Sequence, residues 1–271
     1  CLVVFGTKGG SGKTVVAANL AVALHRHTGK PVCLVDLDTM AVGDLCKMLG
    51  LSPQRSIADL IPHLKRQGPP DRLPLRDVLL EHPSGVHVLQ SLTHPRQLGL
   101  LEAPLLKLLF QALKARYEYV IIDAGKALTD ALIAAFDESN LILLVVTPDI
   151  VTLYQTKWAM GLIESLLFPS SMVKAVINRA ESHGGVGSED GRIAMPCEVI
   201  GEIPSDGRAV GTSVNQGAPV VTLFPGSKIA DAFKRLAETL TNSPHLYLSH
   251  QQIPRHRQPD AAPAMPKFAM Y

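Results

Sequence analysis

The fold is decided by residues 5–14, which are Phe5-Gly6-Thr7-Lys8-Gly9-Gly10-Ser11-Gly12-Lys13-Thr14. They follow the apolar run of residues 2–5 and precede a segment whose apolar residues have helical spacing from about Lys13. A strand, a glycine-rich loop and a helix in this order are the context of a phosphate-binding P-loop. Successive backbone N–H groups of such a loop point at phosphate oxygens, and the helix start adds partial positive charge. The pattern G-x-x-x-x-G-K-[ST] predicts that Lys13 contacts the β- and γ-phosphates and that Thr14 binds Mg²⁺. A glycine turn that binds no nucleotide is the alternative.

The pattern of strands and helices around this loop predicts an α/β fold. Short apolar runs typical of buried parallel strands occur at residues 2–5, 32–35, 86–89, 119–123, 141–146, 172–177 and 199–202. Helical patterns occur at residues 13–28, 43–49, 56–64, 75–81, 104–116, 151–167, 208–215 and 227–241. We therefore expect a doubly wound, mostly parallel sheet of about seven strands, with helices on both faces and right-handed crossovers.

The composition favours a soluble, cytoplasmic protein with one large core. The chain has 271 residues, of which 46% are hydrophobic and 18% charged, and its formal net charge is +2. A charge this small does not indicate a surface that coats nucleic acid, so DNA binding is open but not indicated. The scattered cysteines predict neither zinc nor a disulfide, and no apolar run approaches the ~18 residues that span a bilayer. Locally basic residues, which form either a solvated face or a surface for an anionic partner, are Arg55, Lys65, Arg66, Arg72 and Arg76.

The two ends of the chain suggest further parts outside the main domain. The sequence begins at Cys1 and enters an apolar strand at once, so we expect an upstream domain that precedes it. Residues 1–242 carry the strand and helix patterns. Residues 243–271 are rich in proline, which interrupts helices, and we expect a disordered or partner-binding tail there.

Acidic residues follow two of the predicted strands. Asp36 and Asp38 come after residues 32–35, and Asp123 ends the strand at residues 119–123, as in a Walker B motif that holds Mg²⁺ through water. Open α/β sheets bind ligands at the carboxyl ends of their strands, and alternation along an extended chain points Asp36 and Asp38 to the same side. The alternative is that these two acids cap a helix that begins near Ala41.

The second lysine of the loop, Lys8, is not needed in a general P-loop. The motif from Lys8 to Thr14 resembles K-G-G-x-G-K-[ST], the signature of the MinD/ParA family of deviant Walker A ATPases. This resemblance implies slow hydrolysis of ATP and a homodimer with ATP sandwiched at its interface, in which Lys8 reaches the nucleotide of the facing subunit. A solvated loop cation is the alternative role for Lys8.

The resemblance also implies roles for individual residues. Asp38 would orient the attacking water, and Asn178, which follows residues 172–177, would recognise adenine, although a turn-forming asparagine is the alternative. The predicted catalytic residues are Lys8, Lys13 and Asp38. The predicted nucleotide-binding residues are Gly9, Gly10, Ser11, Gly12, Lys13, Thr14, Val15, Asn178, Arg179, Pro204 and Asp206. The predicted Mg²⁺ site comprises Thr14, Asp36 and Asp123, partly through water.

The chain departs from the family after the Walker B acid. The family often continues as D-x-P-x-G, whereas this chain has Asp123-Ala124-Gly125-Lys126-Ala127, with Gly125 in place of the proline. The conformation of this loop therefore does not follow from the resemblance, and we assign no role to Lys126.

Within the family, residues 36–60 look most like the CpaE/TadZ branch. The matching segments are Asp36-Leu37-Asp38, Gly43-Asp44-Leu45, Leu49-Gly50-Leu51 and Ser56-Ile57-Ala58-Asp59-Leu60. That branch helps to place a pilus or secretion machine at a cell pole, which implies protein partners of such a machine and recruitment to the pole or inner membrane through them. The alternatives are a nucleotide-binding scaffold that does not cycle and a division-site or DNA-partition ATPase of the MinD/ParA type.

Overall fold

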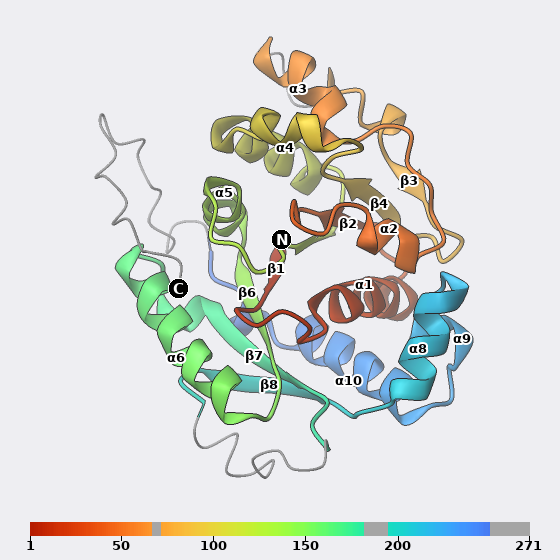
Figure 1. Cartoon of the computed structure of the whole chain (residues 1–271), viewed down its shortest axis with the longest axis vertical. Helices are drawn as coiled ribbons and strands as arrows, with labels where there is room; N and C mark the ends of the chain where they lie inside the picture. Colours follow the sequence, from red (N-terminus) through yellow and green to blue (C-terminus); the bar gives the residue numbers. More distant parts are fainter. Residues whose placement is uncertain (67–71, 182–194, 250–271) are drawn as a thin grey trace.

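The centre of the molecule is an eight-stranded sheet with the strand order β3-β4-β2-β5-β1-β6-β7-β8 (Figure 1). The computed structural model describes residues 1–66, 72–181 and 195–249. The strands are β1 (Leu2–Phe5), β2 (Val32–Asp36), β3 (Leu80–Glu81), β4 (His87–Gln90), β5 (Tyr119–Asp123), β6 (Leu141–Val146), β7 (Val173–Asn178) and β8 (Glu198–Ile203). All neighbouring strands are parallel except β3, which pairs antiparallel with β4. The prediction of a mostly parallel, doubly wound sheet is confirmed.

Helices cover both faces of this sheet (Figure 1). The α-helices are α1 (Lys13–Thr28), α2 (Asp44–Met48), α3 (Ile57–Lys65), α4 (Ala103–Lys114), α5 (Asp130–Glu138), α6 (Ile150–Ser165), α8 (Gly207–Gln216), α9 (Val220–Leu223) and α10 (Lys228–Asn242). Short 3-10 helices are η2 (Leu75–Asp77), η3 (Pro95–Leu100), η4 (Ser170–Met172) and η5 (Pro244–Leu246).

Alternation along the central strands separates two hydrophobic cores. Val3 and Phe5 of β1 pack with α4 and α5, whereas Leu2 and Val4 pack with α1 and α10 on the other face. Successive side chains of β2, β5 and β6 divide between the same two cores. Apart from the acids Asp36 and Asp123 that end β2 and β5, these strands are therefore apolar, as the sequence indicated.

The structure differs from the expected elements at residues 75–81 and in having two further short helices. Residues 75–81 do not form the predicted helix, because the chain makes only the η2 turn and then pairs as β3 with β4. Helices α5 and α9 were not expected from the sequence. Helix α1 is buried all round from Val16 to Leu24, since α10 covers the side that faces away from the sheet.

The described part of the chain continues past the expected boundary at residue 242. Leu246 of η5 is 2% exposed, and Leu248 exchanges hydrogen bonds with Asn140, at the start of β6. Residues 243–249 therefore pack against the domain, whereas the rest of the expected tail, residues 250–271, lies outside the described residues. Residues 182–194 also lie outside the described residues.

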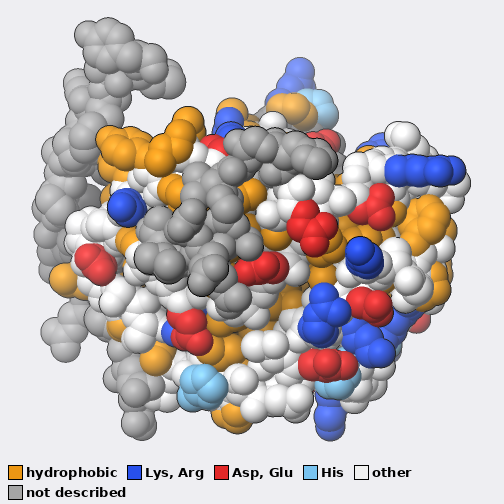
Figure 2. Space-filling view, turned by 90° about the horizontal axis from the view of Figure 1, so that it is seen from below, with side chains coloured by type: hydrophobic (Ala, Val, Ile, Leu, Met, Phe, Trp, Pro, Cys, Tyr) orange, Lys and Arg blue, Asp and Glu red, His pale blue; other side chains and the backbone are white. Residues whose placement is uncertain are grey.

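Charges of both signs are interspersed on the surface seen in Figure 2. Two of the locally basic residues have acidic partners, because Arg55 pairs with Asp77 at 3.7 Å and Lys65 pairs with Glu102 at 2.9 Å. Among the described residues, no helix is both long and apolar enough to cross a bilayer.

Candidate functional site

The glycine-rich loop joins β1 to α1 in a conformation that needs glycine at two positions. Gly10 has φ +77° and Gly12 has φ +90°, in the left-handed region that favours glycine. A side chain at Gly12 would also collide with the amide nitrogen of Asn178. The loop therefore places the first turn of α1 directly after Gly12, as the P-loop interpretation requires.

Lys13 points back into this loop. Its side chain is 8% exposed, and Nζ donates a hydrogen bond to the backbone oxygen of Lys8 at 3.1 Å. Burial lowers the pKa of Lys13, although the charges of Asp123 and Asp38 oppose this shift. The lysine is thus held close to both acids, and its ammonium group is bonded to a backbone carbonyl of the loop.

Asp36 and Asp123 lie side by side at the ends of β2 and β5. They are register partners in the sheet, and each is 1% exposed. Among the described residues, Oδ2 of Asp36 and both carboxylate oxygens of Asp123 lack a partner with hydrogen-bond geometry. Burial and the charge of Asp123 raise the pKa of Asp36 well above its usual value. Burial raises the pKa of Asp123 to about 6, although the nearby Thr14 hydroxyl favours the charged form.

This donor set fits a magnesium ion. Mg²⁺ prefers carboxylate, hydroxyl and water oxygens, and a divalent cation would relieve the repulsion between the two buried acids. No group of three or more His, Cys, Asp or Glu side chains in the described ranges is arranged as a metal site. An ion held by Asp36, Asp123 and Thr14 would therefore take its remaining ligands from water and nucleotide phosphates.

Asp38 lies next to these acids and faces the same site. Its backbone N–H donates to Oδ1 of Asp36 at 3.1 Å, and its own Oδ1 accepts from the N–H groups of Met40 and Ala41 at 2.9 and 3.3 Å. The alternative that Asp36 and Asp38 cap a helix near Ala41 is wrong, because α2 begins only at Asp44 and Gly43 precedes it.

A cavity of about 440 Å³ opens beside the glycine-rich loop. Its lining residues are Gly12, Val15, Asn178, Arg179, Pro204, Ser205, Asp206, Gly207, Val210, Gly211 and Ile229. The structure thus brings together six predicted nucleotide-binding residues, from Gly12 to Asp206, that lie far apart in the sequence. The sequence did not indicate Val210, Gly211 or Ile229, which come from α8 and α10. The one available signal was the spacing of Gly207 and Gly211, which places both glycines on the same side of α8.

Two of the cavity residues also have structural partners. The side-chain nitrogen of Asn178 donates to the backbone oxygen of Ser11 at 2.8 Å, so this amide ties the end of β7 to the glycine-rich loop. Asp206 accepts from the N–H of Ala209 at 2.8 Å and caps α8. Their roles in binding adenine stay predictions.

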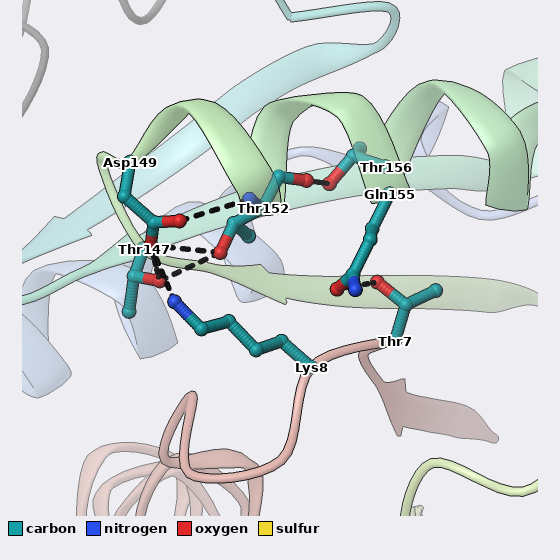
Figure 3. A network of polar contacts seen from close by, with 7 residues as sticks. All are labelled: Thr7, Lys8, Thr147, Asp149, Thr152, Gln155 and Thr156. Carbon is teal, nitrogen blue, oxygen red and sulfur yellow. Dashed lines mark hydrogen bonds and ion pairs between the residues drawn. The ribbon is translucent and has the colours of Figure 1, made fainter. Parts of the chain in front are cut away.

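Lys8 binds an acid of its own chain (Figure 3). Its Nζ lies 2.9 Å from Oδ2 of Asp149, which also accepts hydrogen bonds from the hydroxyl groups of Thr147 and Thr152. Partial burial opposes ionisation of Asp149, but the bonds from Thr147, Lys8 and Thr152 outweigh it and lower the pKa of the carboxyl below its usual value. The sequence did not indicate this pair, whose members lie far apart in the chain.

Residues 2–220 match the family model described as the CobQ/CobB/MinD/ParA nucleotide binding domain. The chain belongs to this family. A curated relative, the antiactivator FleN of Pseudomonas aeruginosa, is 29% identical over 265 residues, which cover 90% of this chain and 86% of FleN. The crystal structure of the cell division ATPase MinD from Pyrococcus furiosus has 26% identity and a TM-score of 0.76, with coverage of 89% and 98% of the two chains. MinD from Pyrococcus horikoshii, complexed with Mg-ADP, has 26% identity and a TM-score of 0.73, with coverage of 88% and 95%.

The family assignment confirms the resemblance carried by Lys8 and Lys13. This MinD/ParA domain has the P-loop, the two strand-end acids and a cavity at one edge of its sheet. Members of the family are ATPases. The family model that this chain matches is that of a nucleotide binding domain.

Proposed function

We propose that this MinD/ParA domain is an ATP-dependent switch that dimerises around ATP and reopens after slow hydrolysis. The observation that carries the proposal is the pair of buried acids, Asp36 and Asp123, whose unpartnered oxygens lie beside Lys13 and Thr14. Buried carboxylates that lack partners are costly, so their presence favours a site that binds a cation together with its nucleotide.

Each residue of the site has a distinct part in this reaction. Lys13 exchanges its bond to the Lys8 carbonyl for the β- and γ-phosphates, and Thr14 with the two acids holds Mg²⁺. The ion neutralises phosphate charge when it is bound. Asp38 orients the attacking water. Its carboxylate lies next to the metal site, and it is free for this role because Asp36 and Asp123 are the acids that hold the ion. The cavity at Asn178 holds the base.

Two variants test this proposal with calorimetry and single-turnover hydrolysis. Lys13→Ala should abolish ATP binding, because it removes the cation that meets the phosphate charge. Asp38→Ala should retain ATP binding but hydrolyse ATP about 100-fold more slowly, since it removes an orienting group and leaves the phosphate site intact. Unchanged ATP affinity in the first variant, or wild-type hydrolysis in the second, would refute the assigned roles. A wild-type protein that binds ATP without hydrolysing it would favour the non-cycling scaffold.

The cellular role we propose is to position or assemble a pilus or secretion machine at a cell pole. It rests on the resemblance of residues 36–60 to the CpaE/TadZ branch. A second candidate is a division-site or DNA-partition role, favoured by the septum site-determining MinD proteins among the relatives, such as that of Thermotoga maritima with 26% identity over 248 residues. Deletion of the coding region in its host separates the two. Loss of pili or secretion with normal septa supports the first, and misplaced septa or plasmid loss supports the second.

A further inference from the structure

The loop after β5 has an unusual backbone at Gly125. This residue has φ +65°, in the left-handed region, at the position where the family pattern often has proline. A proline ring fixes φ near −65°, so proline could not adopt this conformation. The backbone conformation of this loop therefore requires a residue other than proline at position 125.

A second feature of Gly125 is its contact with Asp38. A Cβ atom at position 125 would lie 2.5 Å from both Cγ and Oδ2 of Asp38 and 2.9 Å from Oδ1, closer than real Cβ atoms approach other heavy atoms. Asp38 is not free to retreat, because its Oδ1 is held by the N–H groups of Met40 and Ala41. The Asp38 carboxylate therefore occupies the space that a side chain at position 125 would need.

This contact connects two parts of the site. Gly125 is two residues from Asp123, which fits the metal, whereas Asp38 is two residues from Asp36 on the neighbouring strand. The backbone N–H of Asp38 donates a hydrogen bond to Oδ1 of Asp36 at 3.1 Å, and Asp36 is the register partner of Asp123. Asp38 is thus held beside both of the buried acids at the strand ends.

We propose that Gly125 is a positioning residue, whose missing side chain seats the Asp38 carboxylate against the loop after β5. The inference rests on the proposed function for the role of Asp38 in hydrolysis. Because the loop and the acid are in contact, the backbone at Gly125 limits where the Asp38 carboxylate can lie, and a side chain at this position would displace it.

The test compares Gly125→Ala with Gly29→Ala. Gly29 ends α1 with the same φ of +65°, but nothing lies within 4 Å of the Cβ position there. Both variants force alanine into the left-handed region, but only at position 125 does the new Cβ atom meet the Asp38 carboxylate. We expect Gly125→Ala to lower kcat by about tenfold or more with an ATP Kd within about threefold of wild type. Gly29→Ala should leave both values unchanged.

Thermal unfolding without nucleotide provides a readout that does not depend on hydrolysis. Gly125→Ala should lower Tm more than Gly29→Ala does, and this excess should disappear in the Asp38→Ala background, where the carboxylate is gone. Should Gly125→Ala fail to fold, the double variant with Asp38→Ala should recover the fold.

Each outcome of these experiments has a defined meaning. Wild-type kcat in Gly125→Ala, or equal losses of Tm for the two glycine variants in both backgrounds, overturns the inference while the proposed function stands. A double variant that stays unfolded also overturns it. Absence of hydrolysis in the wild-type protein overturns the proposed function and this positioning role together. If the Tm loss of Gly125→Ala still disappears in the Asp38→Ala background, the contact between the two residues is then one of packing only.

Discussion

At the scale of single residues, Asp36 and Asp123 set the pH dependence of the site. Each is buried beside the other, and the pKa of Asp123 is about 6. Protons therefore compete with a metal ion for these oxygens below that pH. We expect the affinity for the magnesium nucleotide to fall by up to about tenfold per pH unit below pH 6. Calorimetry between pH 5 and pH 8 checks this. Affinity that stays constant across the range would contradict a metal site at these acids.

Ionisation of the same acids should strengthen binding of the metal ion, but it lowers the stability of the ligand-free protein. A carboxyl whose pKa is raised on folding contributes most stability below its unfolded pKa and loses it as pH rises toward the folded pKa. For Asp123 the shift from 3.8 to about 6 corresponds to ~3 kcal/mol, lost between about pH 4 and pH 6. Asp123→Asn should therefore raise the free energy of unfolding at pH 8 by about 1–3 kcal/mol.

Urea denaturation at pH 4 and pH 8 measures this change. Glu81→Gln, which removes a negative charge from an exposed position on β3, is the control and should have little effect at either pH. If Asp123→Asn is instead destabilised at pH 8, the ionised carboxylate has a stabilising hydrogen-bond or ionic partner in the folded protein.

At the scale of elements, three phenylalanines join the sheet to the helices on one face. Phe136 of α5 packs edge-on against Phe5 of β1 and against Phe168, with ring centroids 5.8 and 5.6 Å apart. All three rings are fully buried. Phe136→Ala should lower the free energy of unfolding by about 3–5 kcal/mol, because it leaves a cavity between β1 and the segment after α6.

The matched control is Tyr154→Ala on α6, whose ring is 72% exposed. Its loss should change the free energy of unfolding by no more than about 0.5 kcal/mol. Chemical denaturation of both variants measures the difference. A small effect of Phe136→Ala would mean that α5 does not anchor β1, which leads into the P-loop.

The sequence predicts the central strands because residues that pack on both faces are apolar without interruption. Strands β1, β5 and β6 have the bounds expected from these runs. The edge strand β3 has only two residues and is defined by pairing with β4, so local pattern could not distinguish it from a helix. Helix α5 is short, and the side chain of Thr129 caps its first turn, which is a weak signal in the sequence alone.

The site divides in the same way. The placement of Lys13, Thr14, Asp36 and Asp123 follows from the sequence, because each belongs to a local motif in a strand or loop, whereas their roles stay predictions. The contact of Gly125 with Asp38 could not be predicted, since it depends on two loops meeting across neighbouring strands. A resemblance to relatives that have proline at this position gives no indication of that contact.

At the scale of the whole molecule, Lys8 lies where the P-loop meets α6. Its ion pair with Asp149 is about one-third exposed at both partners, so it contributes no more than about 1 kcal/mol. The first turns of α6 next to this pair carry the exposed apolar side chains of Ile150, Val151 and Tyr154. Lys8 can therefore leave Asp149 at little cost when a second subunit brings its nucleotide to this surface.

If Lys8 serves the facing subunit, its loss should affect dimerisation more than nucleotide binding. Its ammonium meets γ-phosphate charge only when two protomers face each other, so dimer formation should require ATP and not ADP. Lys8→Ala should bind nucleotide as a monomer but fail to dimerise with ATP in the Asp38→Ala background, in which hydrolysis cannot empty the dimer. Sedimentation with ATP and with ADP measures this.

Asp149→Ser separates this role from the ion pair inside one chain. Serine keeps a cap for α6 but removes the carboxylate, so this variant breaks the same ion pair while retaining Lys8. In the Asp38→Ala background it should dimerise with ATP at least as well as the parent, and up to about fivefold more tightly because Lys8 is already released. Loss of dimerisation in both variants would assign the effect to the ion pair with Asp149. Dimerisation in both would leave Lys8 as a cation of the loop, and the sandwich dimer would lose its main support.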